Sequence, residues 1–387
     1  MPLPDIRPAT LSPISLPPAA RHGDTLDAID TPALLLDLDA FERNVALMQA
    51  AASAAGLALR PHAKAHKSVA IAQAQRRAGA VGICCQKVSE ALPFVNAGVN
   101  DVLISNQVVG AAKTALLAQL ALRARISVCV DHEVQIEALA AACAATGSRI
   151  EVLVEIDVGQ QRCGVADAEA VLRLCAAIKR HPQQLHFKGL QAYQGAIQHL
   201  RTVAERRAAA AAAAARAAAV RDALLAAGLA CECITGGGSG TVAFDLSSGV
   251  YTEVQPGSYV FMDADYGRNE AAGLHFEHSL FLLSSVISEG QGDRLVLDAG
   301  LKTLSAECGP PQVWAGGALS ADLSVLALND EHAIVQHLGG PRPTLGQRLL
   351  LVPGHCDPTL NLHDQLVALR GGRVEALWAI EARGLSR

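Results

Sequence analysis

A basic stretch at residues 60–67, RPHAKAHK, carries the first side chains whose types and spacing suggest chemistry. It ends a short apolar segment, residues 57–60, that we predict to be a β-strand. Alternate positions of a strand share a face, so His62 and Lys64 are expected on the same side. A lysine amine between apolar walls is a candidate for a lowered pKa and for a Schiff base with a carbonyl compound. A solvated basic loop is the alternative.

A glycine-rich segment at residues 235–241, TGGGSGT, is the second candidate. Glycines let the backbone approach an anion closely, and the amides with the Ser239 and Thr241 hydroxyls could cradle a phosphate. No Gly-Lys-Ser/Thr follows, so the segment is not a P-loop, and no long helical pattern follows to support a dinucleotide site. We predict a phosphate site, with a structural glycine turn as the alternative.

The third candidate is GHCDPT at residues 354–359. On an extended segment, His355 and Asp357 would lie on one face and Cys356 on the other. An imidazole and a carboxylate suit a divalent metal that keeps several waters. A chance surface pair is the alternative.

Single polar residues follow other expected strands. Gln86, Arg162, Tyr193 and His199 each lie at or shortly beyond a strand end. Each alone would more often be structural, but together they suggest one ligand-binding rim.

Repeated strand and helix patterns would position these residues. Eight apolar strand-like segments are separated by stretches with helical spacing, of which residues 203–227 are the clearest. The strand-like segments cover residues 34–38, 57–60, 81–85, 102–105, 126–130, 151–156, 186–193 and 231–235. Eight repeats predict an α/β fold of the (β/α)8 barrel type, with a doubly wound open sheet as the alternative, and barrel active sites lie at the carboxyl ends of the strands.

Beyond residue 266 the segments become short and are divided by Gly, Pro and Asp, which predicts an antiparallel β domain. We therefore expect an N-terminal arm (1–29) packed on the β domain, a barrel (30–265), and a C-terminal β domain (266–387) that carries His355 and Asp357.

Composition narrows the class of protein. A formal net charge of −5 with 3% aromatic residues argues against a nucleic-acid binder. The longest apolar run, residues 208–220, is interrupted by Arg216 and is too short to span a membrane. The Pro-rich start lacks a hydrophobic signal region, and the 10 cysteines lack C-x-x-C spacing. We expect a cytoplasmic protein that acts on a small molecule.

Together these motifs resemble the fold-type III pyridoxal-phosphate enzymes, which have an alanine-racemase-like barrel. The resemblance is to the branch of D-threonine aldolase and D-serine dehydratase and spans residues 30–387. The stretches that carry it are TPALLLDLDAFERNV, RPHAKAHK, GICCQKVSEA, EIDVGQQRCGV, GLQAYQGAIQH, TGGGSG, GSYVFMDADYG and GHCDPTLNLHD.

The resemblance implies two cofactors and their residues. Pyridoxal 5'-phosphate would be held by Lys64, and His199 would be the catalytic base. A divalent metal, manganese with magnesium or cobalt as alternatives, would bind His355 and Asp357. The further cofactor contacts implied are Gln86, Arg162, Tyr193, Thr235, Gly238, Ser239, Gly240 and Tyr259.

The implied activity is cleavage of D-threonine and related D-3-hydroxy amino acids to glycine and an aldehyde, by a homodimer. The alternatives are a 3-hydroxy-D-aspartate aldolase or dehydratase and a D-serine dehydratase. The last resembles H-x-C at its metal, so Asp357 favours the aldolase. A racemase would need a tyrosine from the C-terminal domain, and none follows Tyr266. A non-catalytic cofactor-binding protein would lack the second domain.

Overall fold

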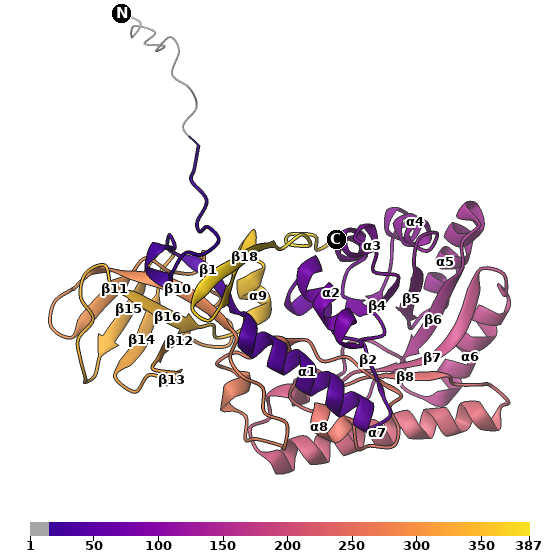
Figure 1. Cartoon of the computed structure of the whole chain (residues 1–387). Helices are drawn as coiled ribbons and strands as arrows, with labels where there is room; N and C mark the ends of the chain where they lie inside the picture. Colours follow the sequence, from indigo (N-terminus) through magenta and orange to yellow (C-terminus); the bar gives the residue numbers. More distant parts are fainter. Residues whose placement is uncertain (1–14) are drawn as a thin grey trace, which may run out of the picture.

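The computed structural model, which describes residues 15–387, has two bodies side by side (Figure 1). The larger body is built around eight parallel strands. Around the ring they are β2 (Ala58–Leu59), β9 (Glu253–Val254), β8 (Cys233–Gly236), β7 (Leu185–Ala192), β6 (Ile150–Glu155), β5 (Arg125–Val130), β4 (Asp101–Gln107) and β3 (Ile83–Cys85). Backbone bonds from Val81 N to Leu59 O (2.9 Å) and from Cys84 N to Pro61 O (2.8 Å) join β3 to β2. The ring is thereby closed, which confirms the predicted barrel.

Helices cover the outside of the barrel. They are α1 (Leu38–Ala54), α2 (Val69–Ala78), α3 (Val88–Asn96), α4 (Ala111–Leu120), α5 (Glu133–Thr146), α6 (Ala168–Lys179), α7 (Val203–Ala226) and the short α8 (Val242–Asp245). The long α7 matches the expected helix, and its alanines have the highest helix propensity. A capping box between Thr202 and Glu205 satisfies its first amide groups. No helix within residues 15–387 is long and apolar enough to cross a membrane.

The smaller body is a sheet whose neighbouring strands are antiparallel, except for one parallel pair, β1 with β17. Its strands are β1 (Ala33–Asp37), β10 (Leu280–Ser288), β11 (Arg294–Leu297), β12 (Gln312–Ala315), β13 (Ala318–Leu319), β14 (Leu323–Leu328), β15 (Ala333–His337), β16 (Arg348–Val352), β17 (Gln365–Arg370) and β18 (Arg373–Ala379). Between β16 and β17 lies α9 (Cys356–Leu360). Short 3-10 turns occur at η1 (Leu26–Ala28), η2 (Ala63–Ala65), η3 (Ala196–His199), η4 (Ser258–Val260) and η5 (Tyr266–Arg268).

One expected barrel strand belongs to the other body. β1, predicted as the first barrel strand, pairs with β10 and β17 of the smaller sheet. Its apolar run is buried on both faces, and the sequence pattern of such a strand is the same in either sheet. The eighth place in the barrel is taken by β9, whose two residues are too few to show a strand pattern. The predicted barrel is therefore confirmed, but the assignment of β1 to it is wrong.

The described part of the predicted arm, residues 15–29, lies on the smaller body. Gly23 N donates to Val374 O (2.8 Å), and Val374 N donates to Asp24 O (2.9 Å). Ile29 is fully buried in an apolar cluster with Leu35 and Phe281. Residues 1–14 of the arm lie outside the described residues, and the domain boundaries remain predictions.

Candidate active site

A cavity opens at the carboxyl ends of the barrel strands, where the smaller body meets the barrel. It encloses about 690 Å³, including its open mouth. Its walls come from both bodies, and nine of the residues expected at a site line it: Lys64, Gln86, Arg162, Tyr193, His199, Gly238, Ser239, His355 and Asp357. The structure therefore brings together residues that lie up to 293 positions apart, from 64 to 357.

Lys64 lies in η2, directly after β2, and its side chain keeps 42% of its surface exposed in the cavity. Its Nζ is 3.7 Å from Asp357 Oδ2. Burial is the largest influence on the pKa of Lys64 and lowers it, but Asp357, Tyr193 and Cys356 together raise it by more, and the net pKa lies above its usual value. The lowered pKa that the sequence suggested is therefore not found, because that analysis placed no carboxylate next to the amine.

His62 supports the same wall. Its Nε2 is 2.9 Å from Ser105 Oγ, and its Nδ1 accepts a bond from Lys64 N (3.3 Å). Burial and the Lys64 charge lower the pKa of His62 to about 3, so this imidazole is neutral at physiological pH. Because the His62 ring is neutral, it adds no second positive charge next to the Lys64 amine.

The glycine loop forms a second wall and suits an anionic group. Ser239 Oγ is buried and, within residues 15–387, has no hydrogen-bond partner. A Cβ at Gly238 would lie 2.6 Å from Gln198 Oε1, which accepts from Gly240 N (3.0 Å), so a larger residue would displace this side chain. The Thr241 hydroxyl is already used, because it donates to Asp245 Oδ2 (2.6 Å). An unpartnered hydroxyl in a glycine-lined cradle is what a phosphate group would satisfy.

His355 and Asp357 form the third wall, although not in the predicted way. Only His355 is extended; Asp357 lies in the first turn of α9, and Cys356 is fully buried. The predicted extended segment is therefore wrong, because a helix starts inside it. The two side chains still meet, since His355 Nε2 is 3.9 Å from Asp357 Oδ1. The two donor atoms are close enough together that both would hold the same divalent cation.

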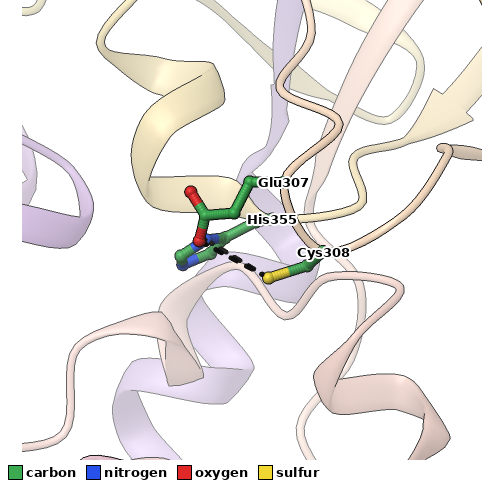
Figure 2. A group of neighbouring side chains, drawn as sticks. All are labelled: Glu307, Cys308 and His355. Carbon is green, nitrogen blue, oxygen red and sulfur yellow. Dashed lines mark hydrogen bonds and ion pairs between the residues drawn. The ribbon is translucent and has the colours of Figure 1, made fainter.

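The other nitrogen of His355 faces residues that the sequence analysis missed. His355 Nδ1 is 3.0 Å from Glu307 Oε1 and 3.7 Å from Cys308 Sγ (Figure 2). These three side chains form a group whose ligand atoms lie within 4.8 Å of one another. Burial raises the pKa of the Cys308 thiol to about 11, which disfavours the thiolate needed for metal binding. A carboxylate on Nδ1 is typical of a histidine that binds metal through Nε2.

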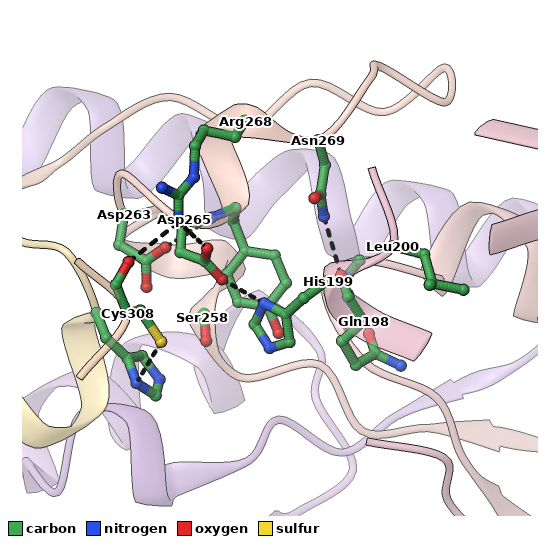
Figure 3. A network of polar contacts seen from close by, with 12 residues as sticks. Gln198, His199, Leu200, Ser258, Asp263, Asp265, Arg268, Asn269 and Cys308 are labelled. Carbon is green, nitrogen blue, oxygen red and sulfur yellow. Dashed lines mark hydrogen bonds and ion pairs between the residues drawn. The ribbon is translucent and has the colours of Figure 1, made fainter. Parts of the chain in front are cut away.

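His199 reaches the cavity from η3. Its Nδ1 is 2.5 Å from Asp265 Oδ2, and its ring centroid is 4.9 Å from that of Tyr266 (Figure 3). Sequence reasoning missed Asp265 and Tyr266, which follow η4 more than 60 positions after His199. The stretch DADYG was visible as a motif, but nothing in its spacing linked it to His199.

Arg162 and Tyr193 lie together on the remaining side of the cavity. The Arg162 guanidinium carbon is 5.7 Å from the centroid of the Tyr193 ring. Within residues 15–387, no carboxylate lies within ion-pair distance of Arg162. Gln86 follows β3 on the same rim and fixes the start of α3, since its backbone amide donates to Glu90 Oε2 (2.8 Å).

Three predicted cofactor contacts do not line the cavity. Tyr259 is fully buried in the core, where its hydroxyl accepts from Gln75 Nε2 (3.1 Å). Thr235 is fully buried one layer below the cavity and donates to Glu253 Oε1 (2.8 Å). Gly240 lines a neighbouring cavity instead. The Tyr259 and Thr235 side chains are therefore not placed to touch a group in the cavity, because both point into the protein interior.

Comparisons with known proteins agree with this architecture. The family model of the alanine racemase N-terminal domain matches residues 36–265, and a model of a serine dehydratase domain matches residues 279–369. A D-threonine aldolase from Arthrobacter sp is 54% identical over 97% of this chain and 98% of its own length. A 3-hydroxy-D-aspartate aldolase from Paracoccus denitrificans is 45% identical over 92% of each chain. The crystal structure of D-threonine aldolase from Filomicrobium marinum superposes with a TM-score of 0.92 at 46% identity, over 96% of this chain and 100% of that one.

Proposed function

The chain belongs to the D-threonine aldolase family of alanine-racemase-like proteins, and from this premise we propose that it cleaves D-threonine and related D-3-hydroxy amino acids to glycine and an aldehyde. It is a carbon-carbon lyase. The observation that carries the proposal is the convergence of an amine, an imidazole and a His-Asp pair on one cavity. Lys64, His199 and His355 with Asp357 supply these groups from three separate elements.

The cavity fits pyridoxal 5'-phosphate. Lys64 would hold the aldehyde end, and the unpartnered Ser239 hydroxyl with Gly238 would hold the phosphate. Gln86, Arg162 and Tyr193 would border the ring. When bound, this cofactor supplies an electron sink for the electron pair left at the substrate α-carbon.

The His355 and Asp357 pair fits a divalent metal. Its carboxylate is a hard oxygen ligand, which suits manganese, with magnesium or cobalt as alternatives. A cation there would supply Lewis-acid polarisation of the substrate hydroxyl.

His199 acts on the proton of the β-hydroxyl. Because Nδ1 faces Asp265, Nε2 is the nitrogen available on the cavity side of the ring. It takes the hydroxyl proton while the bond between the α- and β-carbons breaks and the aldehyde leaves. The remaining fragment takes up one proton at the α-carbon and leaves as glycine.

A 3-hydroxy-D-aspartate aldolase is the second candidate. Its substrate carries an additional carboxylate, which needs a cation in the cavity. Arg162 lines the cavity without a carboxylate partner among the described residues and could serve this purpose. A 3-hydroxy-D-aspartate dehydratase and a D-serine dehydratase, which would release ammonia and a keto acid instead, are the remaining alternatives.

The direct test is a substrate panel with the metal controlled. The purified protein, supplied with pyridoxal phosphate and manganese, should convert D-threonine to glycine and acetaldehyde, and a chelator should abolish this reversibly. Release of ammonia from D-serine, without glycine from D-threonine, would instead identify a dehydratase. Cofactor binding without turnover of D-threonine, D-serine or 3-hydroxy-D-aspartate would identify a non-catalytic protein.

Two further expectations belong to the same proposal. The family resemblance suggests a homodimer in the cytoplasm that contacts neither nucleic acid nor membrane. Light scattering of the eluted protein measures the mass directly, and a single 40.2 kDa species would contradict the homodimer.

A further inference from the structure

Asp265 lies at the centre of the polar network behind His199 (Figure 3). The residue is 4% exposed, and its two carboxylate oxygens have different partners. Oδ2 faces His199 Nδ1 at 2.5 Å, a charge contact that is not aligned as a hydrogen bond in this structure, where Nδ1 has no other partner within residues 15–387. Oδ1 accepts from Arg201 Nη2 (2.6 Å) and from Arg268 Nη2. One oxygen is therefore reserved for the imidazole.

We propose that Asp265 is a positioning residue that holds His199 in the tautomer protonated at Nδ1, with the Nε2 lone pair turned to the cavity. This inference rests on the proposed role of His199 as the base. Only a ring nitrogen without a proton can accept one from the substrate hydroxyl, so the tautomer decides whether His199 can work.

The two arginines make Asp265 suitable for this task. Burial alone would raise the pKa of Asp265, but the Arg268 and Arg201 hydrogen bonds lower it below its usual value. The carboxylate is thus ionised and acts only as an acceptor. Arg201 also donates to Asp265 O and Asn269 Oδ1 (both 2.7 Å), which fixes the loop that carries the carboxylate.

The ring and backbone of His199 are held from the same loop. Tyr266, next to Asp265, packs against the imidazole with 4.9 Å between ring centroids. Asn269 Nδ2 donates to Gln198 O (2.9 Å), and Gln198 Nε2 donates to Thr241 Oγ1 (2.9 Å). The η3 turn is therefore fixed to residues 265–269 and to the glycine loop together.

The two arginines decide how an amide at position 265 is oriented, and Asp265→Asn therefore tests the proposal. The amide oxygen of the new side chain would turn toward the two guanidinium groups, which only donate. Its NH2 group would then face His199 Nδ1 and donate to it. That arrangement favours the tautomer protonated at Nε2, which cannot take the substrate proton.

We expect Asp265→Asn to lower kcat by about 100-fold or more, since a positioned acid-base group contributes about 10²–10⁴. KM and the cofactor absorbance should change little. The matched control is Asp298→Asn, which alters a carboxylate bonded to Ser284 and Thr31 in the smaller body and should leave kcat unchanged. Asp265→Glu keeps an acceptor and should recover part of the lost rate.

Nitrogen-15 NMR of the histidine side chains gives a readout that does not depend on turnover. The His199 signals are assigned by comparison with His199→Gln. We expect Nδ1 protonated in the wild-type protein and Nε2 protonated in Asp265→Asn, a change that a merely structural role would not cause.

Two results would overturn the inference: an Nε2-protonated His199 in the wild-type protein, or full kcat in folded Asp265→Asn. The NMR measurement on the wild-type protein tests the inference even if Asp265→Asn does not fold. Failure of the proposed function is distinguishable, because it would appear as no cleavage of D-threonine by the wild-type protein, whereas full activity in His199→Ala would contradict the base role of His199 alone.

Discussion

At the scale of single residues, His355 is the side chain with two competing surroundings. Its Nε2 faces Asp357, and its Nδ1 faces Glu307 and Cys308. The account places the metal on the Nε2 side, where the second donor lines the cavity together with Lys64. A metal on the Nε2 side and a metal on the Nδ1 side would respond oppositely to substitution of the residues on each side.

We expect His355→Ala and Asp357→Asn to raise the manganese concentration needed for half-maximal activity by more than about 100-fold, because each removes a metal ligand. Glu307→Gln should have a smaller effect of about 10–100-fold, as is typical for the partner of a metal-binding histidine. Titration of metal into chelator-treated enzyme measures all three.

Cys308→Ser is the control for this series. Its thiol contacts the Nδ1 side, so the metal requirement should be unchanged. A large effect of Cys308→Ser together with a small effect of Asp357→Asn would contradict this placement. It would show that the metal binds on the Nδ1 side of His355.

The sequence was informative wherever a residue type and a strand end coincided. Lys64, Ser239 and His355 lie in short local motifs, and the structure places them in one cavity. Asp265 and Glu307 could not be predicted, because each acts through a contact with a residue distant in the sequence. The expected cofactor contact of Tyr259 stays a prediction, and only the fold shows that its side chain points into the core.

At the scale of elements, the glycine loop and η3 are packed too closely to move independently. A Cβ at Gly240 would lie 2.1 Å from Gln198 O, a backbone atom that cannot rotate away. Gly240→Ala should cost about 1–3 kcal/mol through overpacking. The shift that it forces on the neighbouring Gly238 and Ser239, which line the cavity, should weaken pyridoxal phosphate binding.

Cofactor titration followed by absorbance checks this expectation. Gly339→Ala is the matched control, because its Cβ would meet only Asp322 Oδ1, at 3.6 Å. Unaltered cofactor affinity in Gly240→Ala would show that the loop does not hold the phosphate.

A buried acid in α8, the short helix that follows the glycine loop, makes stability depend on pH. Burial raises the pKa of Asp245, which the Thr241 hydroxyl only partly offsets, to about 7. Between about pH 4 and pH 7 the folded state therefore binds more protons than the unfolded state, and stability falls as pH rises. The loss amounts to at most about 4 kcal/mol and is complete above about pH 7.

Asp245→Asn removes this titration. In cofactor-free protein, the gain in unfolding free energy of Asp245→Asn over the wild type should grow from about pH 5 to about pH 8. Thermal or denaturant unfolding at both values measures it. A difference that does not vary with pH would contradict the raised pKa.

The predictions from the sequence were least accurate in assigning strands to the two bodies. The apolar run of β1 has the pattern of a strand buried on both faces, and such a strand fits either sheet. The two-residue β9 showed no pattern at all. Helix α7, by contrast, was predicted almost to the residue, because its alanine-rich helical spacing is a local signal.

At the scale of the whole molecule, the two bodies share one of the buried apolar clusters. Phe41 and Met48 of α1 lie in a single buried cluster with Leu59 of β2 and with Leu280 and Leu282 of β10. Since β1 lies inside the smaller sheet and leads directly into α1, loss of either body would disrupt this shared cluster.

We therefore expect one cooperative unfolding transition. Both tryptophans, Trp314 and Trp378, lie in the smaller body, and Trp378 packs against Phe41 of α1. Tryptophan fluorescence follows the smaller body, whereas far-ultraviolet circular dichroism follows the barrel helices. The two midpoints should coincide. A fluorescence transition at lower temperature would show that the bodies unfold separately.

The account depends most directly on the amine of Lys64. Borohydride reduction of the cofactor-loaded protein, followed by peptide mapping, should place a pyridoxyl group on the peptide with Lys64 and none on Lys67, which is buried against Glu90 at 3.0 Å. Lys64→Ala should abolish the adduct. An adduct on another lysine, or none after the cofactor is supplied, would contradict the account.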